Sequence, residues 1–425
     1  MRLLITLLVL ALFIAIQLYF FKKSKNILKT LFPNRLRQNK ILIRSIVIIY
    51  SVFPFFLISQ FLFLKTGIIE NFYTPKNVLF DYGMIYPFWL LFILVIQIVP
   101  FFVLSELIRI PFLKLFKKPK ERYLIMQSKV LFSIITLFIL YIPIRILYDD
   151  TKIDTLTFNH SISNLHPDLE NLNIVVISDV QADYYTDRNR LQSYIDKVNE
   201  LRPDLIFIAG DMITNTSNYI DLAGEMISKL RAKYGVYAGP GDHDHWAFRE
   251  RSNASSQKSL NEVIKSLESR NVPVFVNENH TINIKSASIK LTSTDQNYAY
   301  RQINRNLLDS LARSGNENTD LKLFLNHQPN LDLVEKAKEY NYDMFLTGHT
   351  HGGQIVFWYP PFFNISGTTL TEPTYIQGKY MSDNLLVVVS AGLGVSIAPI
   401  RYNATPEIIS IRLKSKNNSQ IVMKK

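Results

Sequence analysis

The first 150 residues contain four long apolar stretches separated by short polar loops. A helix needs roughly 20 apolar residues to cross the hydrocarbon core of a bilayer, and each stretch reaches that length. The stretches also lack the polar stripe that a buried helix of a soluble protein usually keeps. The pattern therefore predicts four transmembrane helices, over residues 3–21, 41–64, 84–107 and 130–148.

Basic residues are concentrated in the first and third loops between these stretches. Residues 22–40 carry seven basic and no acidic side chains, residues 109–129 carry a second basic cluster, and residues 65–83 carry two of each sign. Short loops rich in Lys and Arg stay on the cytoplasmic side. We therefore expect a multi-pass protein of the plasma or inner membrane, with everything after the fourth helix outside the cytoplasm. The first stretch is not expected to be a cleaved signal peptide, because no small-x-small site follows it.

Beyond residue 150 short apolar runs alternate with amphipathic helical segments, which is typical of a layered α/β domain. Strands are expected at 173–178, 205–209, 235–238, 272–276, 290–292, 321–325, 343–346, 385–389 and 407–413, and helices at 189–201, 219–233, 257–269, 302–313 and 331–340. Several strands of the second half lack an intervening helix. This arrangement indicates two sheets rather than one.

The charge distribution agrees with this division of the 425 residues. The chain carries a net charge of +12, but residues 1–150 hold 19 basic and 6 acidic side chains and the remainder 28 basic and 29 acidic. A nearly neutral soluble part argues against a nucleic-acid binder, which needs its basic residues on the face that meets phosphates. The absence of cysteine excludes a disulfide framework, a thiolate nucleophile and a cysteine zinc site.

Potential metal ligands follow directly after predicted strands. In open α/β sheets the carboxyl ends of the strands lie along one edge, so such residues can meet in one crevice. A pair of divalent cations about 4 Å apart needs a bridging carboxylate, and Asp211 suits that role. His349 and His351, two residues apart, would point the same way from an extended strand end. The sequence therefore predicts a two-metal site.

The motifs Gly210-Asp211, Gly241-Asp242-His243-Asp244 and Gly348-His349-Thr350-His351-Gly352-Gly353-Gln354, in this order, resemble those of the calcineurin-like metallophosphoesterases. The resemblance covers about residues 160–415 and includes segments 325–329, 392–394, 399–401 and 406–407. It implies a four-layer αββα sandwich over residues 151–425, preceded by a four-helix transmembrane region over residues 1–150.

The resemblance also implies a role for each motif residue. The first metal ion would be held by Asp179, Gln181, Asp211 and His351, and the second by Asp211, Asp242, His327 and His349. His243 would stabilise the transition state or protonate the leaving oxygen, with Asp244 orienting its ring. Two divalent ions (manganese, iron or zinc) would activate a hydroxide that attacks a phosphomonoester, a phosphodiester or a pyrophosphate.

The chain departs from the family pattern at two positions. Gln181 stands where the family has histidine, and an amide oxygen is a weaker, harder donor than imidazole. Asp242 stands where the family has asparagine, which adds one negative charge. Neither change plainly abolishes catalysis, so an active hydrolase is expected. Two alternatives stay open: a catalytically degenerate metal-binding membrane module with a sensing or scaffolding role, and a Gln181 that lies at the surface without touching metal.

Other candidate residues are given ordinary roles. Surface positions are expected for the four histidines outside the motifs, His160, His166, His245 and His280. Asp295 is left out of the site.

An aromatic and proline-rich stretch, residues 356–363, follows the double-histidine motif. Its two prolines exclude a regular helix. The stretch either packs under the sheet or forms a lip that faces the bilayer and admits a lipid-linked phosphoester or pyrophosphate, because exposed aromatics often lie at membrane interfaces.

Overall fold

The computed structural model describes residues 2–66, 75–116, 120–248, 252–295, 305–314, 319–359, 363–371 and 374–416. The chain divides into two compact units. The helical unit comprises residues 1–147 and 357–364, and the α/β unit comprises residues 148–356 and 365–425. Each unit is described separately below.

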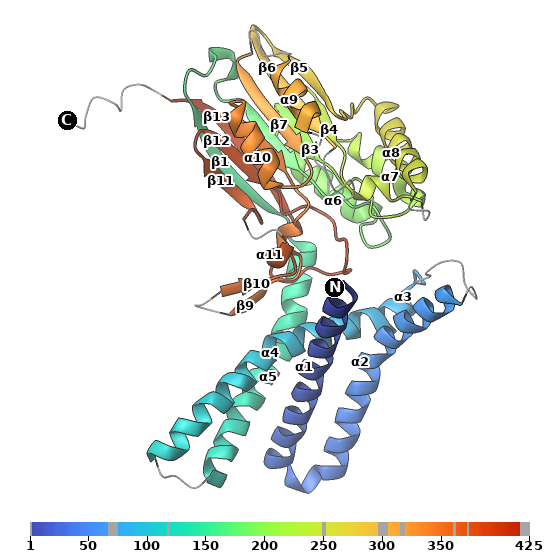
Figure 1. Cartoon of the computed structure of the whole chain (residues 1–425), viewed down its shortest axis with the longest axis vertical. Helices are drawn as coiled ribbons and strands as arrows, with labels where there is room; N and C mark the ends of the chain where they lie inside the picture. The colour runs from blue at the N-terminus through green and yellow to red at the C-terminus, as the bar shows by residue number, and fades with distance from the viewer. Residues whose placement is uncertain are drawn as a thin grey trace, which may run out of the picture. The chain divides into compact units, whose positions relative to one another are not determined.

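The helical unit is built from long apolar helices (Figure 1): α1 (Arg2–Leu31), α2 (Leu36–Lys65), α4 (Tyr86–Phe116) and α5 (Lys120–Thr151), with the short α3 (Val78–Phe80) ahead of α4. Within the described residues, three helical stretches are long and apolar enough to cross a membrane, namely Pro33–Leu64, Val78–Phe112 and Glu121–Thr151. The first predicted stretch also forms a helix, α1. Its crossing of the membrane, and therefore the count of four, stays a prediction.

Part of the aromatic stretch belongs to the helical unit. Strands β9 (Phe357–Tyr359) and β10 (Phe363–Ile365) pair as a small sheet. The rings of Phe92 and Phe357 lie 6.4 Å apart, and Gln97 of α4 donates through Nε2 to the Trp358 carbonyl oxygen at 2.9 Å. The Tyr359 hydroxyl donates to a backbone carbonyl of α4 at 2.8 Å. Phe357 is buried, whereas Trp358 is 55% exposed.

Packing of these aromatics under the sheet of the soluble domain was one of the two expectations. It is wrong for β9, which packs on α4 instead. Residues 360–362 lie outside the described residues.

The α/β unit contains two mixed sheets (Figure 1). The first has the order β1-β13-β2-β3-β4, with β1 at Asp154–Ile162, β13 at Glu407–Ser415, β2 at Asn173–Ile177, β3 at Leu205–Ala209 and β4 at Val236–Gly239. The second has the order β11-β12-β8-β7-β6-β5, with β11 at Gly378–Ser382, β12 at Leu385–Val389, β8 at Met344–Thr347, β7 at Leu321–Asn326, β6 at Ala287–Thr294 and β5 at Glu278–Ile284. Strands β2, β3 and β4 run parallel, as do β6, β7 and β8.

Side chains of β2 show why the sheets stack. Val175 and Ile177 pack into a core beneath helices α6 (Arg188–Glu200), α7 (Ile220–Ile227) and α8 (Asn253–Glu268). Ile174 and Val176 point the other way, into a core shared with the second sheet. A strand buried on both faces reads as a continuous apolar run. Helices α9 (Arg305–Arg313) and α10 (Leu331–Glu339) cover the far face of the second sheet.

The predicted four-layer αββα sandwich is therefore confirmed for the described residues. The predicted strand at 272–276 is wrong, because this segment makes a single isolated bridge, between Val274 and Ala238.

Candidate metal centre

Five strands of the two sheets end at one place in the α/β unit. Asp179, Asp211 and Asp242 follow β2, β3 and β4 of the first sheet, and His327 and His349 follow β7 and β8 of the second. Each residue lies within three positions of the end of its strand. Parallel strands bring their carboxyl ends to the same edge of a sheet, and the two sheets stack on a shared core. The predicted convergence is confirmed.

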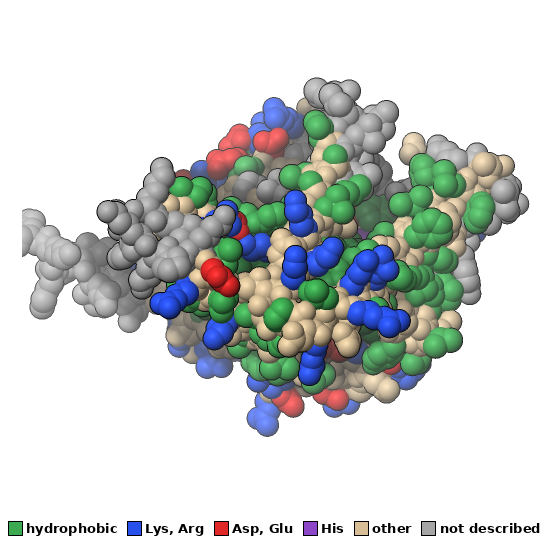
Figure 2. Space-filling model, turned by 90° about the horizontal axis from the view of Figure 1, so that it is seen from below, with side chains coloured by type: hydrophobic (Ala, Val, Ile, Leu, Met, Phe, Trp, Pro, Cys, Tyr) green, Lys and Arg blue, Asp and Glu red, His purple; other side chains and the backbone are tan. Residues whose placement is uncertain are grey.

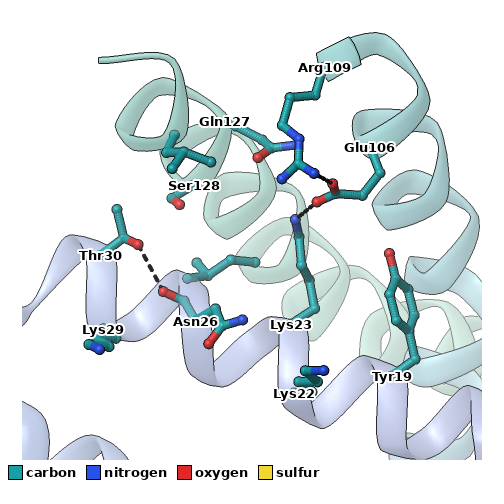
Figure 3. A pocket seen from close by; sticks show the side chains of 12 residues that line it. Tyr19, Lys22, Lys23, Asn26, Lys29, Thr30, Glu106, Arg109, Gln127 and Ser128 are labelled. Carbon is teal, nitrogen blue, oxygen red and sulfur yellow. Dashed lines mark hydrogen bonds and ion pairs between the residues drawn. The ribbon is translucent and has the colours of Figure 1, made fainter. Parts of the chain in front are cut away.

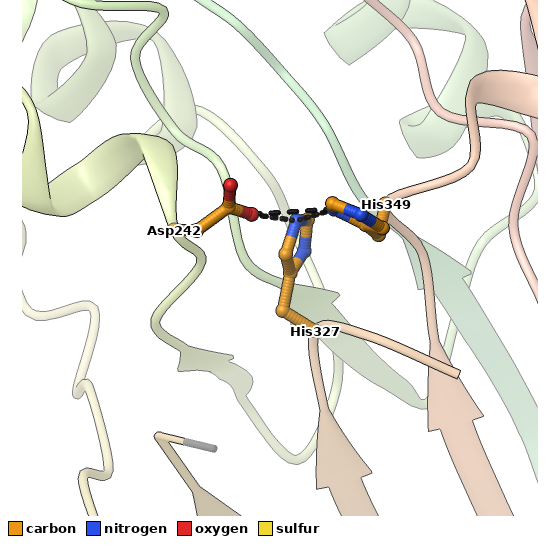
Figure 4. A group of neighbouring side chains, drawn as sticks. All are labelled: Asp242, His327 and His349. Atoms are coloured by element: carbon orange, nitrogen blue, oxygen red, sulfur yellow. Dashed lines mark hydrogen bonds and ion pairs between the residues drawn. The ribbon is translucent and has the colours of Figure 1, made fainter. Parts of the chain in front are cut away.

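His327 lies at the centre of the group. Its Nε2 atom is 3.1 Å from Asp211 Oδ2 and 3.1 Å from Asp242 Oδ1, and its Nδ1 atom is held 2.7 Å from the Ala209 carbonyl oxygen. His349 Nδ1 lies 3.2 Å from the same Asp242 oxygen (Figure 4). The imidazoles thus approach the carboxylates from the opposite sheet.

The remaining predicted ligands join the same cluster. His351 Nε2 is 3.2 Å from Asp179 Oδ1, and Asp179 Oδ1 is 3.9 Å from His327 Nε2. Gln181 donates through Nε2 to Asp211 Oδ2 at 2.8 Å and is fully buried. A surface position for Gln181 is therefore wrong.

Among the residues that the structure describes, two sets of side chains could each hold a metal ion. Asp242, His327 and His349 form one set and Asp179, Asp211 and His327 the other, with the ligand atoms of each set within 4.8 Å of one another. Both sets include His327, whereas the sequence assigned the shared position to Asp211.

Buried oxygen atoms fit a cation at this place. Gln181 Oε1 is buried and has no hydrogen-bond partner in the described part of the chain. Asp179 Oδ1 and Asp242 Oδ1 are also buried, and they face imidazole nitrogens at 3.1–3.2 Å. Leaving such an atom unsatisfied costs about 1–3 kcal/mol. Carboxylate and amide oxygens together with imidazole are a donor set that divalent cations accept. The residues present therefore fit a divalent metal centre.

The charged side chains of the cluster shift one another's pKa values. Burial alone would raise the pKa of Asp179, but the neighbouring His351 and His327 hold that pKa well below its ordinary value. Burial would lower the pKa of His327, but Asp211 and the other carboxylates raise it well above the ordinary histidine value. Asp179 is thus kept ionised, which is the form that binds a cation.

The backbone turns sharply at most of the predicted ligands. Positive φ angles occur at Asp179 (50°), Gln181 (51°), Asp211 (59°), His349 (72°) and His351 (50°). For residues other than glycine this left-handed conformation costs roughly 1–2 kcal/mol each. Strained residues of this kind tend to cluster at functional sites, and here the strain accompanies side chains that meet at one point.

Two glycines allow the surrounding chain to come close. A Cβ atom at Gly241 would lie 2.1 Å from Asp211 Oδ1, and one at Gly392, where φ is +68°, would lie 2.7 Å from the Asp179 Cβ atom. Side chains at these positions would displace Asp211 and Asp179. The absence of a Cβ atom is therefore required for the observed geometry.

His243 and Asp244 lie beside the cluster, but their relation differs from the prediction. The His243 ring contacts the Thr214 carbonyl oxygen through Nδ1, and the Asp244 carboxylate accepts hydrogen bonds from the backbone amides of Gly241, Asp211 and Met212 at 2.9, 3.0 and 2.9 Å. The prediction that Asp244 orients the ring is therefore wrong. Asp244 instead holds the loop that carries Asp211.

The pKa values of both residues are shifted. Burial lowers the pKa of His243, but the charges of Asp211 and Asp242 outweigh it and raise that pKa above the usual value. Burial and the Asp211 charge raise the pKa of Asp244 to about 7.

Arg401 is a neighbour of the site that sequence reasoning gave no role. It is fully buried, and its guanidinium donates to the carbonyl oxygens of Gly394, Ala404 and His351 at 2.7–3.1 Å. Its Nη2 atom is also 3.3 Å from His351 Nδ1, and burial lowers its pKa to about 10. Its place in the C-terminal block of the resemblance was the available signal, but the contacts depend on the fold.

Two histidines expected at the surface are buried instead. His160 is 8% exposed and His245 is 3% exposed. His245 Nε2 lies 3.1 Å from Asp295 Oδ1, and its Nδ1 lies 3.1 Å from the Ser256 hydroxyl. Asp295, left out of the predicted site, thus pairs with a histidine two residues from His243.

Comparison with known proteins agrees with this geometry. The calcineurin-like phosphoesterase family model matches residues 172–353. The uncharacterized metallophosphoesterase YkuE of Bacillus subtilis is 31% identical over 273 residues, which cover 61% of this chain and 86% of that protein. A putative metallophosphoesterase of Caenorhabditis elegans is 29% identical, covering 57% of this chain and 48% of that protein.

A further relative is named as a transmembrane protein with metallophosphoesterase domain, from Danio rerio. It is 25% identical over 254 residues, which cover 60% of this chain and 55% of that protein. The chain thus spans about half the length of this relative and of the Caenorhabditis elegans protein, but most of the length of YkuE. On its family match and its similarity to YkuE, the chain belongs to the calcineurin-like metallophosphoesterase family.

Proposed function

We propose that the protein is a membrane-anchored hydrolase that cleaves phosphoesters with the help of two divalent cations. The observation that carries this proposal is the convergence of carboxylates and histidines from both sheets, together with a buried Gln181 oxygen that has no hydrogen-bond partner in the described residues. Manganese, iron and zinc all suit this mixed oxygen and nitrogen donor set.

Two groups of ligands would hold the cations. Asp179, Gln181, Asp211 and His351 would hold the first, and Asp211, Asp242, His327 and His349 the second. When bound, the cations would supply an activated water nucleophile and would offset the negative charge that develops around phosphorus. His327, which lies near carboxylates of both groups, would keep the two sites at a fixed separation.

His243 would act on the leaving group. A carbonyl oxygen only accepts hydrogen bonds, so the contact with Thr214 places a proton on Nδ1 and leaves Nε2 for the substrate. The raised pKa of His243 favours the protonated ring. Nε2 would then donate a proton to the leaving oxygen, while Asp244 keeps the Asp211 loop in place.

The membrane setting rests on the helical unit. Its apolar helices would span the bilayer, and the basic loops at 22–40 and 109–129 would lie in the cytoplasm, which would put the metal centre on the other side. The exposed Trp358 of β9, on a strand that packs on α4, suits a membrane interface. We therefore include lipid-linked phosphoesters among the proposed substrates.

The experiment is turnover of p-nitrophenyl phosphate and bis-p-nitrophenyl phosphate by the full chain in detergent with added manganese. Asp211→Asn and His349→Ala should each lower turnover by at least about 100-fold, whereas Asp196→Asn, an exposed carboxylate of α6, should leave it unchanged. Manganese binding without turnover of either compound would favour the degenerate binding module. No bound metal at all would refute the proposal.

The lipid-linked substrate has its own test. Trp358→Ser should lower turnover of a phosphoester dispersed in lipid while leaving p-nitrophenyl phosphate turnover unchanged. Equal rates for wild type and variant on both substrates would show that this residue does not help a lipid substrate to enter.

A further inference from the structure

A polar cavity of about 750 Å³ lies between α1, α4 and α5 of the helical unit (Figure 3). Its lining includes four basic side chains, Lys22, Lys23, Lys29 and Arg109, and one acidic side chain, Glu106. Ligand sites typically enclose about 300–1,000 Å³. The cavity therefore has the size of a binding site, and it lies far along the chain from every predicted metal ligand.

The charges of this cavity are unbalanced. Glu106 pairs with Lys23 and accepts from Arg109 Nη2 at 2.8 Å, so two cations share one carboxylate (Figure 3). Lys22 and Lys29 form no ion pair with any residue in the described ranges. Three positive charges thus remain uncompensated among the lining residues. A basic pocket of this kind favours an anion that can accept several hydrogen bonds.

Neutral donors complete the lining. Tyr19, Ser128 and Asn26 also line the cavity and carry hydroxyl or amide donors, whereas the Thr30 hydroxyl donates to the Asn26 carbonyl oxygen at 3.0 Å (Figure 3). Hydroxyl, amide, ammonium and guanidinium donors together match the oxygens of a phosphate group.

The helices that line the cavity expose apolar side chains. Leu18 on α1 is 64% exposed and Leu107 on α4 is 62% exposed, close in sequence to the lining residues. Figure 2, seen toward the ends of the long helices, shows Lys and Arg side chains gathered there among hydrophobic ones, with few Asp or Glu. A ligand with a phosphorylated head and an apolar tail would match both surfaces.

We propose that this cavity binds the phosphate group of an anionic membrane lipid. Lys22 and Lys29 supply charge that no acid of the lining neutralises, and Lys23 and Arg109 turn from Glu106 toward the lipid phosphate. Basic pockets between membrane helices are known to recognise such headgroups. A lipid is favoured over soluble phosphate because the helices that line the pocket expose apolar side chains. This site is separate from the proposed catalytic function and does not depend on it.

The test uses the delipidated full chain in neutral detergent, with native mass spectrometry to measure bound phosphatidylglycerol. Lys22→Gln/Lys29→Gln should weaken binding about 10- to 30-fold, since each basic residue near an anionic lipid strengthens binding by roughly 3- to 5-fold. Lys25→Gln/Lys40→Gln is the matched control, because it removes the same charge from exposed residues that do not line the cavity. Glu106→Gln should tighten binding, because Lys23 and Arg109 lose their competing carboxylate.

Phosphatidylcholine and inorganic phosphate are the comparison ligands. The site would be supported if phosphatidylglycerol binds tightly and neither phosphatidylcholine nor inorganic phosphate displaces it. The lysine double variant should in addition bind more weakly, and Glu106→Gln more tightly, than the wild type. Equal losses in the two lysine double variants would overturn it in favour of diffuse surface charge. Displacement by millimolar inorganic phosphate would overturn the lipid source, and equal binding of phosphatidylcholine would overturn recognition of net charge.

Discussion

Replacement of Gln181 by leucine should weaken metal binding while leaving the stability of the metal-free protein nearly unchanged. The change removes the hydrogen bond from Nε2 to Asp211, which as a bond to a charged group contributes about 1.5–3 kcal/mol. It also removes the buried Oε1 atom, which lacks a hydrogen-bond partner among the described residues and costs about 1–3 kcal/mol. The two effects have opposite signs. The metal-free protein should therefore unfold at nearly the wild-type temperature.

With metal present the two proteins should differ. Loss of a residue that orients or supplies a ligand typically lowers metal affinity 10- to 100-fold, or about 1.4–2.8 kcal/mol. For a unit of this size that free energy corresponds to about 3–10 °C in Tm. Gln181→Leu should thus lose about that much of the manganese-induced rise in Tm, and Gln181→His, which supplies an imidazole, should exceed the wild-type rise.

The assay is thermal unfolding of the full chain in detergent, first with EDTA and then with increasing manganese. Gln192→Leu, which changes an amide on α6 that bonds Asp196, is the matched control and should behave as wild type. A manganese-induced shift of wild-type size in Gln181→Leu would refute the reasoning, because the amide would then hold no metal.

Three further predictions concern residues around the centre. Arg401→Met should lower the free energy of unfolding in urea by about 3 kcal/mol or more, because several buried carbonyl oxygens lose their donor; a loss below about 1 kcal/mol would contradict this. Gly392→Ala should lower the free energy of unfolding by about 1–3 kcal/mol and weaken manganese binding, because its Cβ atom would displace Asp179. Gly378→Ala is the control: with φ at +94° and no atom within 4 Å of its Cβ position, it should strain the backbone without affecting metal binding. Burial raises the pKa of Glu407 to about 7, so the folded chain keeps its proton while the unfolded chain releases it near pH 4.5. The free energy of unfolding should then fall by up to about 3 kcal/mol as the pH rises from 4.5 to 7. Glu407→Gln should remove that loss in thermal melts at pH 5 and pH 8. If wild type and variant lost the same stability between these pH values, the prediction would be wrong.

The sequence predicted best those strands whose residues form one uninterrupted apolar run. Strands β3 and β12 begin and end where their apolar runs do, and the metal-type residues could be placed because they follow such runs. Strands β1 and β5 were missed because each mixes polar and apolar residues without a clean buried run. Strand β1 is held in place by β13, roughly 250 residues further along the chain, and such pairing leaves no trace within a short window.

The contacts around the site show the same limit. The residue types of the ligand cluster could be anticipated, but several contacts come from loops distant in sequence. These are the acceptor for His243, two of the amides that bind Asp244 and the His351 carbonyl that Arg401 binds. The burial of Gln181 likewise depends on the loop conformation, since a polar amide gives no sequence signal for a core position.

The strand β9 has a consequence for how the α/β unit can be produced. The α/β unit is formed by two separate segments of the chain. Residues 357–364, which connect these segments in sequence, group with the helical unit. A fragment that begins at residue 151 would carry this segment without α4, leaving the apolar face of Phe357 in water. Such a fragment should aggregate or demand detergent. A fragment that begins at residue 151 and carries a short glycine–serine linker in place of residues 357–364 is the truncation that the architecture recommends for a water-soluble α/β unit.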